Sequence, residues 1–308
     1  MTVSPRVLSS NQGPNVCWVV ALKSEAKPLI SFFKLSLQSG NNIFPIYKND
    51  KLRYALVISG VGQVNAAAAT AFLASRTNAP PWAAWINLGI AGSADGEIGK
   101  IYQGIKVRSP DKNKIFFPGC RFAKILELME IQTVDRPCPS AKNGVLHDME
   151  ASAFVDVAAR FSCNELIFCF KVVSDITETD MTVINKELAG SLIEVNLHII
   201  QALLLEIDIL TQLEKQRLQV PVEVEEILGQ FHFSVSRQNQ LIRKFKKWRV
   251  VFPTRTVNDL IDDNTVLIGN VEEVLLDAIA IEALARENGD DELENTIKEY
   301  GFVPRLLQ

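Results

Sequence analysis

The sequence predicts an α/β fold in which a twisted, mostly parallel or mixed sheet is covered by helices on both faces, giving three layers. Short apolar runs alternate along the chain with segments of helical character. Each run is continuously apolar, which is typical of strands that are buried on both faces. The chain has 308 residues, 47% of them hydrophobic, so it can build one large core and still carry an appendage.

The expected strands and helices follow one another in order. Each strand is an unbroken apolar run, and each helix begins after a polar or glycine-containing turn. The expected strands are 16–22 (VCWVVAL), 53–59 (RYALVIS), 83–88 (AAWINL) and 165–175 (ELIFCFKVVSD). The expected helices are 24–35, 64–75, 148–162 and 186–208, and residues 105–145 look less regular.

The chain changes character after residue 210. We expect a flexible segment at 1–13, an α/β domain at 14–210 and a helical C-terminal extension at 211–308. The extension contains an expected helix at 267–286, capped by Asn270. It also contains a basic stretch, 237–249 (RQNQLIRKFKKWR), with six basic and no acidic residues. We expect this stretch to form a solvated helix face. Binding to nucleic acid or to an acidic protein is the less favoured alternative.

The composition argues against several classes of function. A net charge of −4 gives no general attraction to nucleic acid or to an anionic membrane. Five cysteines without a CxxC pair indicate reduced thiols and a cytoplasmic protein, and three histidines make a structural zinc site unexpected. No secretory signal and no membrane-spanning run is recognisable in the sequence.

Three carboxylates stand where a ligand would bind to such a sheet, beyond the carboxyl ends of its strands. Asp175 ends the run 165–175, Glu25 follows the first run, and Glu150 opens a helix. A half-desolvated Asp175 could serve as a general acid, although aspartate at a strand end also caps turns. Glu25 and Glu150 could equally be ordinary acidic residues that are stabilised by a helix N-terminus.

The residues beside these carboxylates suggest a sugar pocket. A carboxylate such as Glu150 can accept two hydrogen bonds from a vicinal diol, and Met149 next to it offers soft apolar surface to a ring. Glycine turns at 59–62 and 89–92 would let the backbone approach a ligand closely. Neither turn matches a dinucleotide fingerprint or a P-loop.

Five segments in order carry a resemblance to a known family: VVALKSEAKPLI, VISGVGQVNAAAA, INLGIAGSADGEIG, DMEASAF and KVVSD. Together they resemble the nucleoside phosphorylase/nucleosidase superfamily, and within it the methylthioadenosine/S-adenosylhomocysteine nucleosidases. The resemblance covers about residues 14–208. It implies cleavage of the N-glycosidic bond of a purine or related nucleoside in a homo-oligomer that uses neither a metal nor an organic cofactor.

The resemblance also implies a role for each matching residue. Asp175 would protonate the leaving base, Glu25 would position water, and Glu150 with Met149 would hold the ribose. Lys171 would orient Asp175, unless it is a strand-end lysine that reaches solvent. The other residues expected to shape the substrate pocket are Gly62, Ile90, Ala91, Gly92 and Ser174, and those expected to stack on the base are Phe116, Phe117 or Phe122.

Hydrolysis is favoured over phosphorolysis, because ALKSEAKPL has a glutamate and no arginine where phosphorylases clamp phosphate. Inorganic phosphate as a co-substrate remains the first alternative. The second is a catalytically weakened nucleoside-binding or scaffold protein acting through its C-terminal extension. Ile90, where the family usually has a small hydroxyl residue, and the unusual segment 105–145 motivate this second alternative.

Overall fold

The computed structural model describes residues 13–40, 43–111, 113–136, 143–176, 185–230 and 234–251. The chain divides into two compact units, Met1–Leu218 and Gln219–Gln308. The expected boundary at residue 210 falls inside a helix, α6 (Leu197–Leu218). The expected helix 267–286 and all but Gly13 of the expected flexible segment lie outside the described residues.

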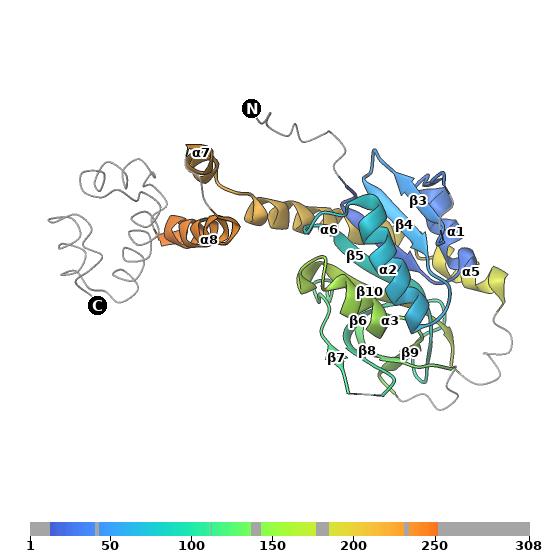
Figure 1. The fold of residues 1–308 in the computed structure, drawn as a ribbon. Coiled ribbons are helices and arrows are strands. Elements are labelled where there is room, and N and C mark those ends of the chain that lie inside the picture. Colours follow the sequence, from blue (N-terminus) through green and yellow to red (C-terminus); the bar gives the residue numbers. More distant parts are fainter. Residues whose placement is uncertain are drawn as a thin grey trace. The chain divides into compact units, whose positions relative to one another are not determined.

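A mixed ten-stranded sheet forms the centre of the first unit (Figure 1). The described residues give five parallel and five antiparallel strand pairings. The prediction of an α/β fold is therefore confirmed, and the sheet is mixed rather than mostly parallel. The strands are β1 (Val16–Val20), β2 (Ser36–Leu37), β3 (Ile46–Asn49), β4 (Tyr54–Ile58), β5 (Ala84–Ser93), β6 (Ile101–Arg108), β7 (Ile115–Phe116), β8 (Glu127–Thr133), β9 (Val145–Asp148) and β10 (Ile167–Asp175).

Part of the sheet closes on itself. The strand order is β10-β6-β8-β9-β5-β1-β4-β3-β2, and β10 also pairs with β5. Strands β5, β10, β6, β8 and β9 therefore form a ring in which β5 lies between β9 and β10. This closure brings the ends of β5, β9 and β10 together, although β9 and β10 are separated by α3 in the chain.

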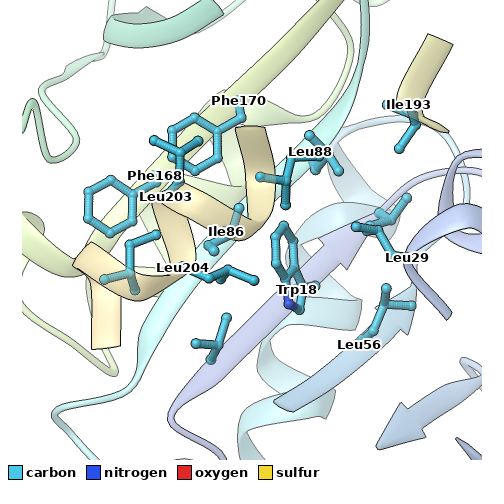
Figure 2. Close-up of a cluster of buried hydrophobic side chains, with 14 of the residues drawn as sticks. Trp18, Leu29, Leu56, Ile86, Leu88, Phe168, Phe170, Ile193, Leu203 and Leu204 are labelled. Atoms are coloured by element: carbon cyan, nitrogen blue, oxygen red, sulfur yellow. The ribbon is translucent and has the colours of Figure 1, made fainter. Parts of the chain in front are cut away.

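Helices cover the sheet on two sides, and each side has its own apolar core. Residues Trp18, Leu56, Ile86 and Phe170 pack with helices α1, α5 and α6, as Figure 2 shows for part of this cluster. The alternate residues of the same strands, such as Cys17 and Val57, pack with α2 and α3. Burial on both faces explains the continuous apolar runs in the sequence. The helices are α1 (Lys23–Phe32), α2 (Gln63–Thr77), α3 (Ala151–Ala158), α5 (Lys186–Glu194) and α6, with a 3-10 turn at Asn164–Leu166.

Three expectations about the elements need correction. Gly89–Gly92 is not a turn, because β5 continues to Ser93 and these residues pair with β10. The single helix expected at 186–208 is two helices, α5 and α6, bent by 55° at Val195 and Asn196. The segment 105–145, expected to be irregular, contains the end of β6 and all of β7 and β8.

The described part of the second unit consists of α7 (Val222–Gln230) and α8 (Val235–Val251). In α8 the side chains of Leu241 and Phe245 are buried, so the basic stretch has an apolar side within this unit. Across the described ranges, no single helix is both long and apolar enough to cross a membrane, and only the bent pair α5 and α6 meets the length and composition requirement jointly.

Candidate active site

A cavity of about 300 Å³ opens at the carboxyl ends of β1, β5 and β10. Eight of the ten predicted site residues line it, and the other two, Gly62 and Lys171, contact residues of its wall. The full lining is Ala21, Leu22, Glu25, Val61, Ile90, Ala91, Gly92, Val134, His147, Asp148, Met149, Glu150, Ser174 and Asp175. Residues more than 100 positions apart in the chain therefore meet at one place, as the sequence predicted.

Glu25 is held in the cavity wall by two backbone amides. Leu22 N donates to its Oε2 at 2.9 Å, and Ile90 N donates to its Oε1 at 2.9 Å. The bond from Leu22 is the first-turn contact expected of an ordinary helix-start glutamate, whereas the bond from Ile90 reaches across to β5. Burial raises the pKa of Glu25, and the two amides and Lys171 oppose that rise only in part. The carboxyl group is thus fixed in position and is a stronger base than usual once ionised.

Ile90 serves this arrangement through its backbone. Its amide orients Glu25, and that contact would be the same for any side chain except proline. Its side chain lines the cavity and packs against the core. The absence of a hydroxyl at position 90 therefore leaves the position of Glu25 unaffected.

Glu150 points into the cavity because another residue caps its helix. Asp148 Oδ2 accepts hydrogen bonds from Glu150 N at 3.1 Å and from Ala151 N at 2.7 Å at the start of α3. Glu150 occupies the N-cap position but makes no side-chain cap; its Oε1 instead accepts from Gly62 N at 2.7 Å. Gly62 has φ of +99°, a conformation that favours glycine.

The pKa of Glu150 is raised to about 7. Burial is the largest cause, and the negative charges of Asp148 and Glu25 add to it. Attraction to Lys171 and the hydrogen bond from Gly62 act in the opposite direction. The charge of the Glu150 side chain therefore changes near neutral pH. We expect its ionised form to be the one that can hold a diol.

Lys171 is buried behind the cavity and pairs with Asp148. Its Nζ lies 2.8 Å from Asp148 Oδ2, and the lysine is 1% exposed. Burial alone would lower the pKa of Lys171, but attraction to Asp148 and Glu150 outweighs it and raises the pKa. Both expectations for Lys171 are corrected: its ion-pair partner is Asp148 rather than Asp175, and its side chain does not reach solvent.

Asp175 lies at the end of β10, and its carboxyl group lies over Gly92, which has no side chain. Ser174 Oγ donates to Asp175 Oδ1 at 2.5 Å and contacts Ala91 O at 3.3 Å. A Cβ added to Gly92 would come within 2.7 Å of Asp175 Oδ2, so the carboxyl group occupies space that only glycine leaves free. Gly92, Ala91 and Ser174 thus shape the site by placing Asp175.

Six lining residues were not predicted as site residues, and two of them, His147 and Asp148, carry ionisable side chains. Both belong to β9, which has no apolar run to reveal it, and they precede the methionine and glutamate on which the prediction concentrated. Burial lowers the pKa of His147, with Asp148 and Asp175 acting in the opposite direction. The signal that could have found them is the run of polar residues directly before Met149.

None of the three aromatic residues expected to stack on a base lines the cavity. Phe122 is buried in the core against Phe168 and Phe170, and Phe117 is 64% exposed. Phe116 lies half-buried against the core on the α2 and α3 side. Among the described lining residues, His147 has the only aromatic ring, and none is an arginine or lysine.

The described part of the chain contains no group of three or more histidine, cysteine, aspartate or glutamate side chains arranged to hold a metal ion. Four described cysteines, Cys17, Cys120, Cys163 and Cys169, are free thiols, while Cys138 lies outside the described residues. The cavity thus presents three predicted carboxyl groups, a fourth that is paired with a lysine, and one imidazole. Such a set can donate and accept protons and can hold hydroxyl groups.

The sequence matches no protein-family model and no curated protein. The fold, in contrast, matches solved structures along almost their full length. A 5'-methylthioadenosine/S-adenosylhomocysteine nucleosidase from Helicobacter pylori superimposes with a TM-score of 0.55 at 12% identity, covering 63% of this chain and 99% of the other.

Two further solved structures match in the same way. The corresponding nucleosidase of Neisseria meningitidis gives a TM-score of 0.51 at 19% identity, with 61% of this chain and 98% of the other covered. The futalosine hydrolase of Helicobacter pylori gives 0.52 at 13% identity, with 63% and 98% covered. Over 61–63% of its length, this chain therefore has the fold of these nucleosidases, as the resemblance of its sequence implied for the fold.

Proposed function

We propose that this protein is a nucleosidase that hydrolyses the N-glycosidic bond of a purine nucleoside. One observation carries the proposal: Glu25, Glu150 and Asp175, far apart in the chain, bring three carboxyl groups to one cavity that lacks a cationic lining side chain among the described residues. The fold neighbours support it, since they are nucleosidases, and two of them were crystallised with immucillin-type ligands such as methylthio-immucillin-A.

The three carboxyl groups fit the needs of this reaction. As the bond between the sugar and the base breaks, the sugar becomes an oxocarbenium-like cation and the base carries away the electron pair. Asp175 gives its proton to the departing base, and Glu25 accepts a proton from the water that attacks the sugar carbon. Ionised Glu150 holds the ribose hydroxyls, and its negative charge stabilises the cationic sugar. The products are free base and free ribose or ribose derivative.

The charge of the cavity favours water over phosphate as the nucleophile. Four acidic side chains line it, and the nearest lysine, Lys171, is buried and paired with Asp148. An incoming phosphate would lose its hydration and meet negative charges without a matching cation. Phosphorolysis is therefore the less favoured function of this site.

Incubation of the full chain with a panel of nucleosides tests the proposal. We expect chromatography to detect free purine base at the same rate with and without 10-fold excess phosphate. Release that requires phosphate would replace hydrolysis by phosphorolysis. Tight nucleoside binding without base release over hours would instead support a nucleoside-binding or scaffold role. Sedimentation of the same sample tests the further proposal that the chain is a homo-oligomer.

A pH profile tests the role assigned to Glu150. Because its pKa is about 7 in the folded protein, we expect kcat/KM to fall as the pH decreases below about 7, through a higher KM and a lower kcat, since protonation weakens the hold on the ribose and removes the charge that stabilises the cationic sugar. Glu150→Gln should lower kcat/KM by about 10-fold or more and remove this limb of the profile. An unchanged limb in the Gln variant would assign the titration to another group.

The same group affects stability with a definite sign. Its pKa is raised from 4.5 to about 7 on folding, so the folded state retains the proton over that range. The contribution of Glu150 to stability is therefore fully present below pH 4.5 and is lost as the pH rises to about 7. Hydrolysis thus needs the charge state of Glu150 that is less favourable for folding.

A further inference from the structure

His147 and Asp175 flank the same glycine. Strand β5 lies between β9 and β10, and Gly92 of β5 pairs with His147 on one side and with Asp175 on the other. Residues directly opposite each other in neighbouring strands project to the same face of the sheet. The pairing places His147 on the Gly92 face, the Oδ2 of Asp175 lies over Gly92 despite a register shift in β10 just before Asp175, and both residues line the cavity. Two strand spacings separate their backbones by roughly 10 Å.

His147 has a hydrogen-bonding atom that the protein leaves unused. Its Nδ1 is buried and has no hydrogen-bond partner within the described residues. A histidine with a purely structural role would have this nitrogen satisfied by the protein. Rotation about the Cβ–Cγ bond can turn either edge of the ring to the cavity. An imidazole in this place is therefore available to a ligand beside Asp175.

The charge state of His147 suits a neutral ligand. Burial lowers the pKa of this histidine, so the ring is neutral near pH 7. A neutral imidazole donates through one nitrogen and accepts through the other. It can therefore match either an amino group or a carbonyl oxygen on the ligand. A positively charged ring could only donate.

The polar edge of a purine has the right pair of groups for these two side chains. Protonation at N7 makes the base a better leaving group, and the group next to N7 on the same edge is the 6-substituent, an amino group in adenine and an oxygen in guanine or hypoxanthine. A carboxyl group placed at N7 would leave the 6-substituent to a neighbour on the same side of the base. His147 is the cavity residue that shares Gly92 with Asp175.

We propose, building on the nucleosidase function, that His147 hydrogen-bonds the 6-substituent of the purine while Asp175 protonates N7, and that His147 thereby sets the selectivity for 6-substituted purine nucleosides over those without a 6-substituent. The inference extends the function, because neither the three carboxyl groups nor the fold distinguishes these substrates. It makes His147 a specificity-determining residue rather than a part of the proton-transfer machinery.

The test compares His147→Phe with the unaltered protein on adenosine, inosine and purine riboside, which has no 6-substituent. Phenylalanine keeps a planar ring and removes both nitrogens. We expect kcat/KM for the preferred 6-substituted nucleoside to fall by about 10-fold or more relative to purine riboside, whose own kcat/KM changes by less than about 3-fold. An equal loss on all three substrates, or no change in their ratios, would overturn the proposal.

Two further variants control for structural effects. His198→Phe makes the same substitution on the exposed face of α6, where the ring contacts Phe32, and should leave all three ratios unchanged. His147→Gln restores a donor and an acceptor, so it should recover discrimination between 6-substituted nucleosides and purine riboside. A Gln variant that behaves like the Phe variant would assign the effect to ring shape and contradict the proposal.

Calorimetry with free bases separates this inference from the proposed function. If the unaltered protein releases no base from any nucleoside, hydrolysis fails, but binding of adenine, hypoxanthine and unsubstituted purine still tests His147. The proposal then requires His147→Phe to weaken binding of adenine or hypoxanthine by about 10-fold relative to unsubstituted purine. Equal binding of the three bases by the unaltered and Phe proteins, or no binding at all, would reject it.

Discussion

Asp175→Asn is expected to lower kcat by about 10²–10⁴-fold while the protein remains folded. Asparagine has the same shape but no proton to give to a departing base. Its oxygen can still accept the hydrogen bond from Ser174 Oγ, which lies 2.5 Å from Asp175 Oδ1. The amide nitrogen would take the place of Oδ2 over Gly92, where no side chain obstructs it. The loss should therefore reflect chemistry rather than a collapse of the site.

Initial rates of base release on a purine nucleoside measure this effect, with KM determined separately. We expect KM to change by less than about 5-fold, because the proposed function assigns the ribose to Glu150 and Met149 and not to Asp175. Asp156→Asn, the same substitution on the outer side of α3 where Asp156 pairs with Lys114, is the matched control and should retain full activity. If Asp175→Asn hydrolyses the nucleoside as fast as the unaltered chain, Asp175 is not the general acid.

The strands that place this acid were predictable because they are buried on both faces. Residues 54–58 read as a continuous apolar run, and residues 167–173 as an apolar run interrupted only by Lys171, which is typical of covered strands. Strand β8 (ELMEIQT) mixes polar and apolar residues because one of its faces is half-exposed, so it does not stand out in the sequence. The closure of the ring by the pairing of β10 with β5 depends on contacts between distant segments, which no local pattern encodes.

The site residues that lie at or just after the ends of predicted strands could be predicted from the sequence. Glu25 and Asp175 could be placed because ligands bind beyond the carboxyl ends of the strands in such sheets. The ion-pair partner of Lys171 could not be predicted, because Asp148 belongs to β9, which the sequence did not reveal as a strand. His147 was missed for the same reason. Glu150 was recognised from its motif, but the cap that frees it, Asp148, is visible only in the structure.

Lys171→Met is expected to lower the free energy of unfolding of the first unit by about 3 kcal/mol. Methionine fills most of the space of the lysine chain but leaves Asp148 without its cation, and the side chain of Asp148 is fully buried. Breaking a buried pair in this way typically costs about 3–5 kcal/mol. Three other hydrogen bonds still reach the Asp148 carboxylate, from Thr133 Oγ1, Glu150 N and Ala151 N, so the lower end of the range applies.

Urea unfolding followed by tryptophan fluorescence measures this loss, since Trp18, Trp82 and Trp85 lie in the first unit. Lys106→Met is the matched control. Lys106 makes a half-exposed pair with Glu130, which also contacts Arg108, so its removal should cost less than about 1 kcal/mol. Similar losses for the two variants would show that the buried pair of Lys171 and Asp148 contributes no more to stability than a half-exposed ion pair.

The double variant Lys171→Met/Asp148→Asn separates the cost of the lost pair from the cost of an unpaired charge. Asparagine can still accept the backbone bonds at the start of α3 but carries no charge, so we expect it to recover about 1 kcal/mol or more relative to Lys171→Met. The recovered stability would show that the lysine is retained to neutralise Asp148, the residue that caps α3 and leaves Glu150 free to face the cavity. A double variant that is less stable than Lys171→Met would contradict this account and leave the two residues with independent structural roles.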